Sequence, residues 1–336
     1  MNKKTENENK TKEDIKESKD TNINKSNVKE NLQNNEKQEL LDIKNDYVFK
    51  RTFGYKGDEE VTKVLLRDIL GMKVNEINLD VNPITEKELM DDKLGIMDIA
   101  SVVNDNVQVD IEMQVVNKNN IEKRIMYYWN AYYQKSISKG DDYGALKRTI
   151  IILIADFEIK GIEQAKKYFT EWEIREKDYS ELILTDVLKI CIIELPKYIK
   201  YKVNNPNLNL WTEFLENPEV VNMSEKDIEN EKNESLKTTK KAIKQAKDTL
   251  EQISKDKHEQ ELARLRKKYI MDQNAIQEYG YCRGIEEGVE IGKRDGIKIG
   301  KYESMKETAK KMLAKKMPVD VIIEITGLSR EEIEKL

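Results

Sequence analysis

The chain has 336 residues, of which 38% are hydrophobic and 37% are charged, and this length predicts about two domains. Lys and Arg number 59 against 64 Asp and Glu, so the net charge of −5 provides no general attraction to nucleic acid. Two cysteines and one histidine exclude a disulfide framework and a Cys/His zinc site, and no apolar run is long enough to cross a membrane.

The first ordered segment is predicted near residue 40. Residues 1–38 consist largely of Lys, Glu, Asn and Asp, and they bury too little apolar surface to offset their chain entropy, so we expect a disordered polar tail. In LLDIKNDYVFKRTFG, residues 40–54, the apolar spacing predicts a helix with Asn45 or Asp46 as its cap. A second helix is predicted over residues 58–70.

The most informative stretch is LGIMDIASVVNDNVQVDIEMQVV, residues 94–116. From residue 107 onward apolar and polar side chains alternate strictly, which predicts a strand, and the apolar run before it predicts another. Asn104, Asp105 and Asn106 lie between the two runs and favour a turn, because Asn and Asp tolerate left-handed backbone. Such a hairpin pairs Val103 with Val107.

Counting outward from that pair places Asp98 across from Glu112, on one face of the hairpin and roughly 5 Å apart at Cβ. Two carboxylates this close repel each other unless a positive group lies between them, and a divalent cation is one such group. The amide of Gln114 shares the same face. The alternation alone also suits an ordinary hairpin with one solvated face, which is the default for antiparallel strands.

Downstream of the hairpin, the pattern predicts a sheet flanked by helices. Residues 120–138 form a predicted helix on which Arg124 is either a phosphate ligand or a surface residue. Residues 149–155 and 188–195 are near-continuous apolar runs, which suit strands buried on both faces of a mixed or parallel sheet. We expect a helix at 161–172 between them, so the fold class is α/β.

The last part of the chain is predicted to be a long helical C-terminal extension. Residues 223–278 are rich in Lys and Glu, which indicates a charged helical linker. In the module at 279–336, glycines recur at every fourth position from Gly280 to Gly300 and allow another helix to approach closely, so we expect a homo-oligomer through this region. Its final short helices outline a helix–turn–helix, but their glutamates favour a packing or oligomerisation module.

Three segments of the chain, two of them in the hairpin, carry a family resemblance. LGIMDI and QVDIEMQ, with NDYVFKRTFG upstream, resemble the Rpn family of recombination-promoting nucleases, which are also labelled transposases of the PD-(D/E)XK class. The resemblance covers residues 41–157 and implies a restriction-endonuclease-like mixed sheet in a nuclease domain at 39–222. Asp98 and Glu112 match the Asp and the acidic residue of (Asp/Glu)-x-Lys, whereas Gln114 occupies the Lys position. Asp46 matches the acid of the family's Asp-x-x-Phe-Lys opening.

The resemblance implies a DNA endonuclease that depends on Mg²⁺ or Mn²⁺ and promotes recombination. Asp98, Glu112 and the backbone carbonyl of Met113 would hold the metal. Asp98, Glu112 and Gln114 form the expected catalytic set, and Asp46 and Arg124 the supporting one. A neutral amide at position 114 can orient water but supplies no positive charge.

Two other functions remain open from the sequence. One is an inactive DNA-binding protein with a relic nuclease fold, and the other is an oligomeric interaction protein whose glycine-repeat tail assembles copies. In either case DNA or a second copy is the expected partner. The abundance of Lys, Asn and Ile suggests an AT-rich bacterial genome, and the N-terminus has no apolar signal core, so we expect a protein of the bacterial cytoplasm.

Overall fold

The computed structural model describes residues 39–55, 59–80, 98–117 and 120–336. The expected disordered tail at 1–38 and the first residues of the hairpin, 94–97, lie outside these ranges. The chain forms two compact units, Met1–Lys267 and Lys268–Leu336. Within the described residues, no helix is long and apolar enough to cross a membrane.

A six-stranded mixed sheet forms the centre of the first unit, in the order β1-β2-β3-β4-β6-β5. Its strands are β1 (Ile77–Asp80), β2 (Ile99–Val103), β3 (Val107–Gln114), β4 (Arg148–Ala155), β5 (Phe169–Arg175) and β6 (Ile183–Glu194). The pairs β3–β4 and β4–β6 are parallel and the others are antiparallel. The predicted α/β class and mixed sheet are therefore confirmed.

The β2–β3 hairpin has the predicted register, with Val103 paired to Val107. Asn104 and Asp105 in its turn have left-handed backbone, with φ of 48° and 62°. The Asn104 side chain also accepts hydrogen bonds from the N–H groups of Asn75 and Glu76, which fixes the turn against the chain that enters β1. Local turn chemistry thus sets the register of every residue on β3.

The helix predicted at 161–172 is wrong. Gly161 has a φ of +93° in a turn, and the chain from Phe169 onward is strand β5, which pairs with the edge of β6. The residues of FTEWEIR alternate in the way that suits a half-buried strand. Pairing with the long strand β6 therefore outweighs the weak helical spacing of the residues before it.

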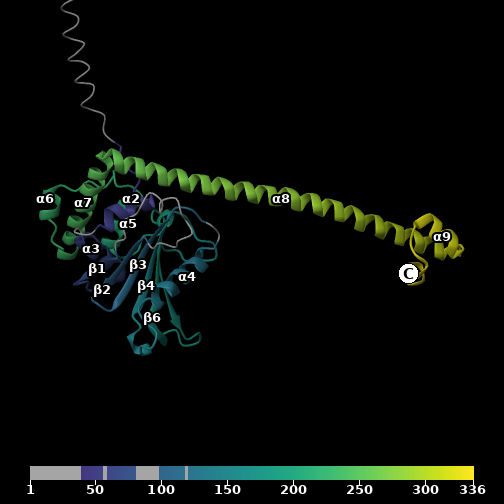
Figure 1. The fold of residues 1–336 in the computed structure, drawn as a ribbon, viewed down its shortest axis with the longest axis horizontal. Helices are drawn as coiled ribbons and strands as arrows, with labels where there is room; N and C mark the ends of the chain where they lie inside the picture. The colour runs from purple at the N-terminus through teal and green to yellow at the C-terminus, as the bar shows by residue number, and fades with distance from the viewer. Residues whose placement is uncertain (1–38, 56–58, 81–97, 118–119) are drawn as a thin grey trace, which may run out of the picture. The chain divides into compact units, whose positions relative to one another are not determined.

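Helices cover both faces of the sheet (Figure 1). One face packs against α2 (Asp46–Phe53), α3 (Glu59–Leu70), α5 (Pro206–Glu216) and α7 (Glu234–Lys255). The other face packs against α4 (Ile121–Gln134). Short elements complete the unit, namely η3 (Tyr143–Ala145), η4 (Leu195–Lys197) and α6 (Glu225–Glu229). The polar residues of β3 lie on the α4 side, because β3 and β4 are in register and alternate together.

Helix α7 differs from the outward linker that the charge pattern predicted. Its apolar seam, which includes Ile243 and Leu250, is buried in the main core against α2, α3 and α5. Its lysines Lys240 and Lys244 form ion pairs with Glu231 and Glu225 instead of presenting a free basic surface. A narrow seam of apolar residues is therefore enough to dock a highly charged helix.

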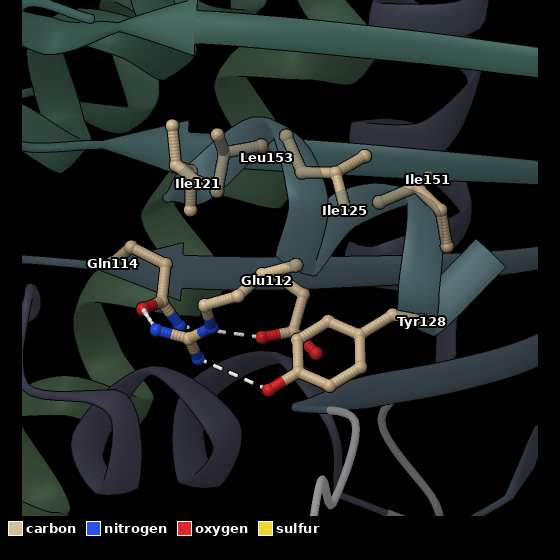
Figure 2. A pocket seen from close by; sticks show the side chains of 8 residues that line it. Glu112, Gln114, Ile121, Ile125, Tyr128, Ile151 and Leu153 are labelled. Atoms are coloured by element: carbon tan, nitrogen blue, oxygen red, sulfur yellow. Dashed lines mark hydrogen bonds between the residues drawn. The ribbon is translucent and has the colours of Figure 1, made fainter. Parts of the chain in front are cut away.

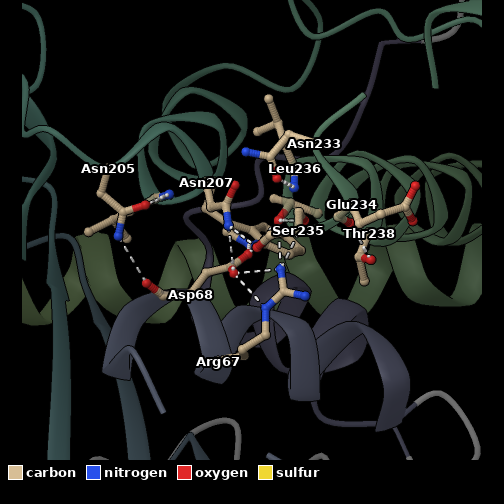
Figure 3. Close-up of polar contacts among 12 residues, drawn as sticks. Arg67, Asp68, Asn205, Asn207, Asn233, Glu234, Ser235, Leu236 and Thr238 are labelled. Carbon is tan, nitrogen blue, oxygen red and sulfur yellow. Dashed lines mark hydrogen bonds and ion pairs between the residues drawn. The ribbon is translucent and has the colours of Figure 1, made fainter. Parts of the chain in front are cut away.

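A buried carboxylate on α3 holds α5 and α7 in place (Figure 3). Asp68 accepts hydrogen bonds from Trp211 Nε1 at 2.9 Å and from Thr239 Oγ1 at 2.7 Å. Asn207 donates a third at 3.2 Å, and Arg67 pairs with the same carboxylate at 2.6 Å. Charged hydrogen bonds of this kind are stronger than neutral ones, so Asp68 links three helices that lie far apart in the sequence.

The second unit contains most of α8 (Lys257–Ala314), followed by α9 (Val319–Thr326) and α10 (Arg330–Glu334). The end of α8 packs against the two short helices through Ala309, Met312, Ile322, Leu328 and Ile333. A capping box between Ser329 and Glu332 starts α10. Gly280 to Gly300 lie within α8 and are exposed.

Candidate active site

The two predicted metal-binding carboxylates approach each other at one end of the β2–β3 pair. Ile99 pairs with Ile111, so the preceding Asp98 lies opposite Glu112. Asp98 Oδ2 accepts a hydrogen bond of 2.8 Å from the backbone N–H of Met113. Glu112 is buried, with an exposed fraction of 4%. The hairpin register thus brings the two carboxylates together, as expected.

The backbone of Met113 fits the role of a third oxygen donor. In an extended strand, the N–H and C=O groups of one residue point to the same side. The N–H of Met113 points toward Asp98, whereas the carbonyl of Gln114 points the other way and accepts from Asp156 N–H at 2.9 Å. The Met113 carbonyl therefore lies on the Asp98 side of β3, between the two strands.

Asp110 is a third carboxylate that sequence reasoning did not include in the site. It lies two residues before Glu112 on the same face of β3, is fully buried, and pairs with Ala100. Both of its oxygens, and Oε1 of Glu112, are buried without a hydrogen-bond partner among the residues that the structure describes. The signal was present in the alternation of QVDIEMQ, which places Asp110 in the same polar row.

The three carboxyl groups resist ionisation in the metal-free protein. Desolvation raises the pKa of Asp98 well above its usual range, and repulsion by Glu112 raises it further. The pKa of Asp110 is raised by desolvation and then by Asp98, and that of Glu112 by desolvation and then by Asp110. The Arg124 guanidinium lowers the pKa of Glu112 and so partly offsets the repulsion. The cluster therefore favours any positive group that reaches it.

Gln114 connects Glu112 to a cation on α4 (Figure 2). Gln114 Nε2 donates to Glu112 Oε2 at 3.3 Å, and Gln114 Oε1 accepts from Arg124 Nη1 at 3.1 Å. Arg124 Nη2 donates to Tyr128 Oη at 3.0 Å, and the guanidinium lies 5.5 Å from the Tyr128 ring centre. Ile121 and Ile125 line the same small pocket. Arg124 is therefore part of the site and not a solvated surface residue.

Asp46 lies on α2 and does not cap that helix. The cap is Asn45, whose side chain accepts from the N–H groups of Tyr47 and Val48. Asp46 instead binds Arg266 through both carboxylate oxygens, with Nε at 3.0 and 2.8 Å. Its negative charge also contributes to the raised pKa of Asp98. Asp46 is thus close enough to affect the site and is itself neutralised by α8.

The residues of the site fit a divalent cation that is only partly held by protein. Carboxylate and carbonyl oxygens are the ligands that Mg²⁺ and Mn²⁺ prefer, and the two Asp110 oxygens and Glu112 Oε1 have no hydrogen-bond partner among the described residues. No cluster of three or more His, Cys, Asp or Glu side chains arranged for a metal is found among the described residues. Mg²⁺ commonly uses one or two carboxylates plus water and substrate phosphate, which matches this donor set.

Comparison with protein-family models identifies the larger part of the chain. Residues 43–280 match the PD-(D/E)XK nuclease family transposase model, and this span is more than half of the 336 residues. The chain belongs to this family. The span contains the whole sheet, the carboxylates of the hairpin and Arg266, so a nuclease-type function is supported. No curated protein and no solved structure matches the chain.

The C-terminal residues of this PD-(D/E)XK family member match a second model. Residues 303–336 match the C-terminal HTH domain of the Rpn/YhgA-like nuclease family. The interpretation as a packing module is therefore replaced by a helix–turn–helix domain. Glu332, one of the glutamates that argued against it, has a structural role: it completes the capping box and accepts from Tyr302 Oη at 2.6 Å. Those bonds lower its pKa to about 2.

Proposed function

We propose that this protein is a DNA endonuclease that uses Mg²⁺ or Mn²⁺ to hydrolyse phosphodiester bonds in the bacterial cytoplasm, in the course of DNA recombination. The observation that supports the proposal most directly is the carboxylate pair at the end of the hairpin, where Asp98 faces Glu112 and Glu112 Oε1 is buried without a hydrogen-bond partner among the described residues. The family match supports the nuclease class of the reaction.

The chain's own residues have distinct roles in this proposal. Asp98, Glu112 and the Met113 carbonyl hold the cation, and the Met113 N–H fixes one Asp98 oxygen so that the other is available. The bound cation polarises the scissile phosphate and makes water a better nucleophile. Gln114, held by Arg124, orients the attacking water through its amide. The remaining cation ligands come from water and from the DNA.

The test is cleavage of supercoiled and linear DNA with Mg²⁺ or Mn²⁺ by the full chain. Asp98→Ala and Glu112→Ala should abolish metal-dependent nicking and weaken Mn²⁺ binding in calorimetry. Asp105→Asn is the matched control, because it removes an exposed carboxylate from the turn of the same hairpin and Asn tolerates its positive φ. Absence of cleavage with every metal, combined with intact DNA binding, would instead favour an inactive DNA-binding protein.

DNA is the partner that we propose for both units. The match to a helix–turn–helix domain supports duplex binding by residues 303–336, because such domains place a helix in the major groove. The isolated segment Lys268–Leu336 should therefore bind duplex DNA in a salt-dependent manner. A fragment that is folded by circular dichroism but does not bind DNA at low salt would contradict this assignment.

We also propose that the glycine-repeat part of α8 associates with a second copy. Large apolar side chains such as Ile285, Val289 and Ile297 are exposed there, 49% to 59% of their surface, beside glycines with open space around them. Residues 280–291 hold three glutamates and one arginine, a net charge of −2, whereas residues 293–301 hold four basic residues and one aspartate, a net charge of +3. Two antiparallel copies would therefore bring segments of opposite charge together.

Sedimentation equilibrium tests this self-association. Gly292→Leu should lower the dimer fraction, because a large side chain would separate the two helices at their crossing point. Lys310→Leu is the control, because it places the same side chain at an exposed position outside the repeat. Gly71→Leu would be unsuitable, because Gly71 has positive φ and a leucine there would strain the backbone. A wild-type chain that remains monomeric at all concentrations would exclude the proposal.

A further inference from the structure

The site has one cation fewer than the proposed reaction needs. Phosphodiester hydrolysis builds negative charge on the phosphate oxygens, and enzymes stabilise it with positive groups that are already in place. The position that holds Lys in the family motif is occupied by the neutral Gln114. Arg124 is engaged with Gln114 and Tyr128 on the α4 side. The missing charge is therefore sought on the other side of the carboxylates, toward α2.

Lys50 on α2 lies next to the start of β2. A methyl group placed on Gly54 would lie 3.4 Å from both Lys50 Cγ and Ile99 Cγ1, so the Lys50 stem and the residue that follows Asp98 both lie close to Gly54. Lys50 is half-buried. Desolvation dominates the raised pKa of Asp98 and of Asp110; the Lys50 ammonium opposes that rise at Asp98, and at Asp110 it does so together with Lys135, whose effect there is the larger. Its charge therefore reaches the carboxylates of the site.

Asp46, the acid best spaced to pair with Lys50, is bound by another residue. Asp46 lies one helical turn earlier on the same side of α2, at the spacing that favours an ion pair. Arg266 from α8 binds both oxygens of Asp46, and the pair is largely buried, with exposed fractions of 15% and 18%. Within the described residues, the Lys50 side chain has no ion pair and no hydrogen bond. Both oxygens of Asp46 are thus bound by Arg266 and not by Lys50.

We propose that Lys50 is a catalytic residue that contacts the scissile phosphate and supplies the positive charge that Gln114 lacks. Arg266 is the positioning residue that keeps Lys50 available by holding Asp46. This inference rests on the proposed nuclease function and adds to it a phosphate ligand from a different element of the fold. It requires no change in the cation ligands Asp98 and Glu112.

DNA affinity measured against salt concentration tests the contact without cleavage. With Ca²⁺ in place of Mg²⁺, Lys50→Gln should lower the slope of log K against log salt by about 0.9, the value for one lost phosphate contact. Lys50→Arg should retain the slope. Lys226→Gln removes an exposed lysine on α6, outside the carboxylate site, and should leave the slope unchanged. An unchanged slope in Lys50→Gln overturns the proposal.

Single-turnover cleavage with Mg²⁺ tests the catalytic role. Lys50→Gln should reduce the rate roughly 10²-fold or more, as expected for loss of one preorganised charge, and Gln114→Lys in the same chain should restore part of it. Mn²⁺ binding without DNA should remain at least as tight, because a repulsive neighbour is removed. Weaker Mn²⁺ binding, or full cleavage activity in Lys50→Gln, overturns the proposal.

Arg266 provides an independent test of the positioning step. Arg266→Ala should let Asp46 capture Lys50 and lower the salt slope as Lys50→Gln does. Asp46→Asn in the same chain should restore the slope, and a purely structural role for Arg266 would not produce this rescue. A wild-type chain without metal-dependent cleavage would refute the proposed function, whereas the salt slopes would still decide whether Lys50 contacts phosphate.

Discussion

Arg124 Nη1 donates a hydrogen bond to Oε1 of Gln114 at 3.1 Å, and this contact fixes which way the Gln114 amide faces. With its oxygen bound to Arg124, the amide presents its N–H groups toward Glu112, at 3.3 Å from Oε2. Without that donor, the amide could rotate and present its oxygen to the carboxylate. The orientation of the motif's third residue is therefore determined by the helix α4 and not by β3.

Arg124→Gln should lower the cleavage rate roughly 10- to 100-fold, the usual effect of losing a residue that orients a metal-site group. The loss should appear in kcat more than in KM, because Arg124 acts through Gln114. Arg124→Lys keeps the charge but cannot contact Gln114 and Tyr128 with the same fork geometry, so it should recover only part of the rate. Steady-state kinetics on one DNA substrate provides the measurement.

Asp110→Asn should stabilise the metal-free protein at neutral pH. Desolvation and Asp98 raise the folded-state pKa of Asp110, so folding favours the protonated form. The contribution of protonated Asp110 to folding stability is complete below its unfolded-state pKa, near 4. It is lost as the pH rises through the folded-state pKa. Asn resembles the protonated acid, so the variant should unfold like the wild type near pH 4 and be more stable by about 1 kcal/mol or more at pH 7.5. Urea denaturation in EDTA at both values checks this, and a less stable variant at pH 7.5 would contradict it.

Asp68→Ala should destabilise the first unit by about 3 kcal/mol or more, because Trp211, Thr239 and Asn207 each lose a charged acceptor inside the protein. Asp68→Asn should cost less, since an amide oxygen can still accept some of these bonds. Chemical denaturation followed by Trp fluorescence provides the comparison. Equal effects of the two substitutions would indicate that the charge of Asp68 is unimportant.

Only one of the two thiols should react in the native protein. Cys191 is fully buried on β6, and burial raises its pKa to about 12, so little thiolate forms at neutral pH. Cys282 on α8 is exposed. A thiol reagent should therefore modify one group per chain under native conditions and two after unfolding. Cys282→Ser should abolish the native reaction, and persistent labelling in that variant would show that the β6 strand opens.

The hairpin and its carboxylate pair could be predicted from sequence because the information is local. Asn104 and Asp105 specify the turn, and alternation then fixes which residues share a face. Alternation also places Asp110 on the face of Glu112. The burial of its carboxylate without a partner among the described residues, however, depends on α4 covering that face. Local pattern thus determined the position of the third acid but not its environment.

The remainder depends on contacts between distant segments. Arg266 meets Asp46 across 220 positions of the sequence, and no spacing rule relates the two. Residues 169–175 form a strand because they pair with the edge of β6. The spacing of their own apolar residues does not reveal this pairing. Helix α7 likewise looks like a solvated helix until its narrow seam is matched with α3 and α5.

The position of Arg266 in the sequence also determines when the site can be completed during synthesis of the chain. The sheet and its carboxylates are encoded before residue 200, but Thr239, which completes the bonds of Asp68, comes later, and Arg266 later still. Chains emerge from the N-terminus, so for the last seventy or so residues before Arg266 the nascent chain holds its hairpin without the group that withdraws Asp46 from Lys50. If Lys50 and Arg266 act as proposed, the site is complete only when synthesis of the nuclease-family domain is nearly finished, shortly before the helix–turn–helix segment follows.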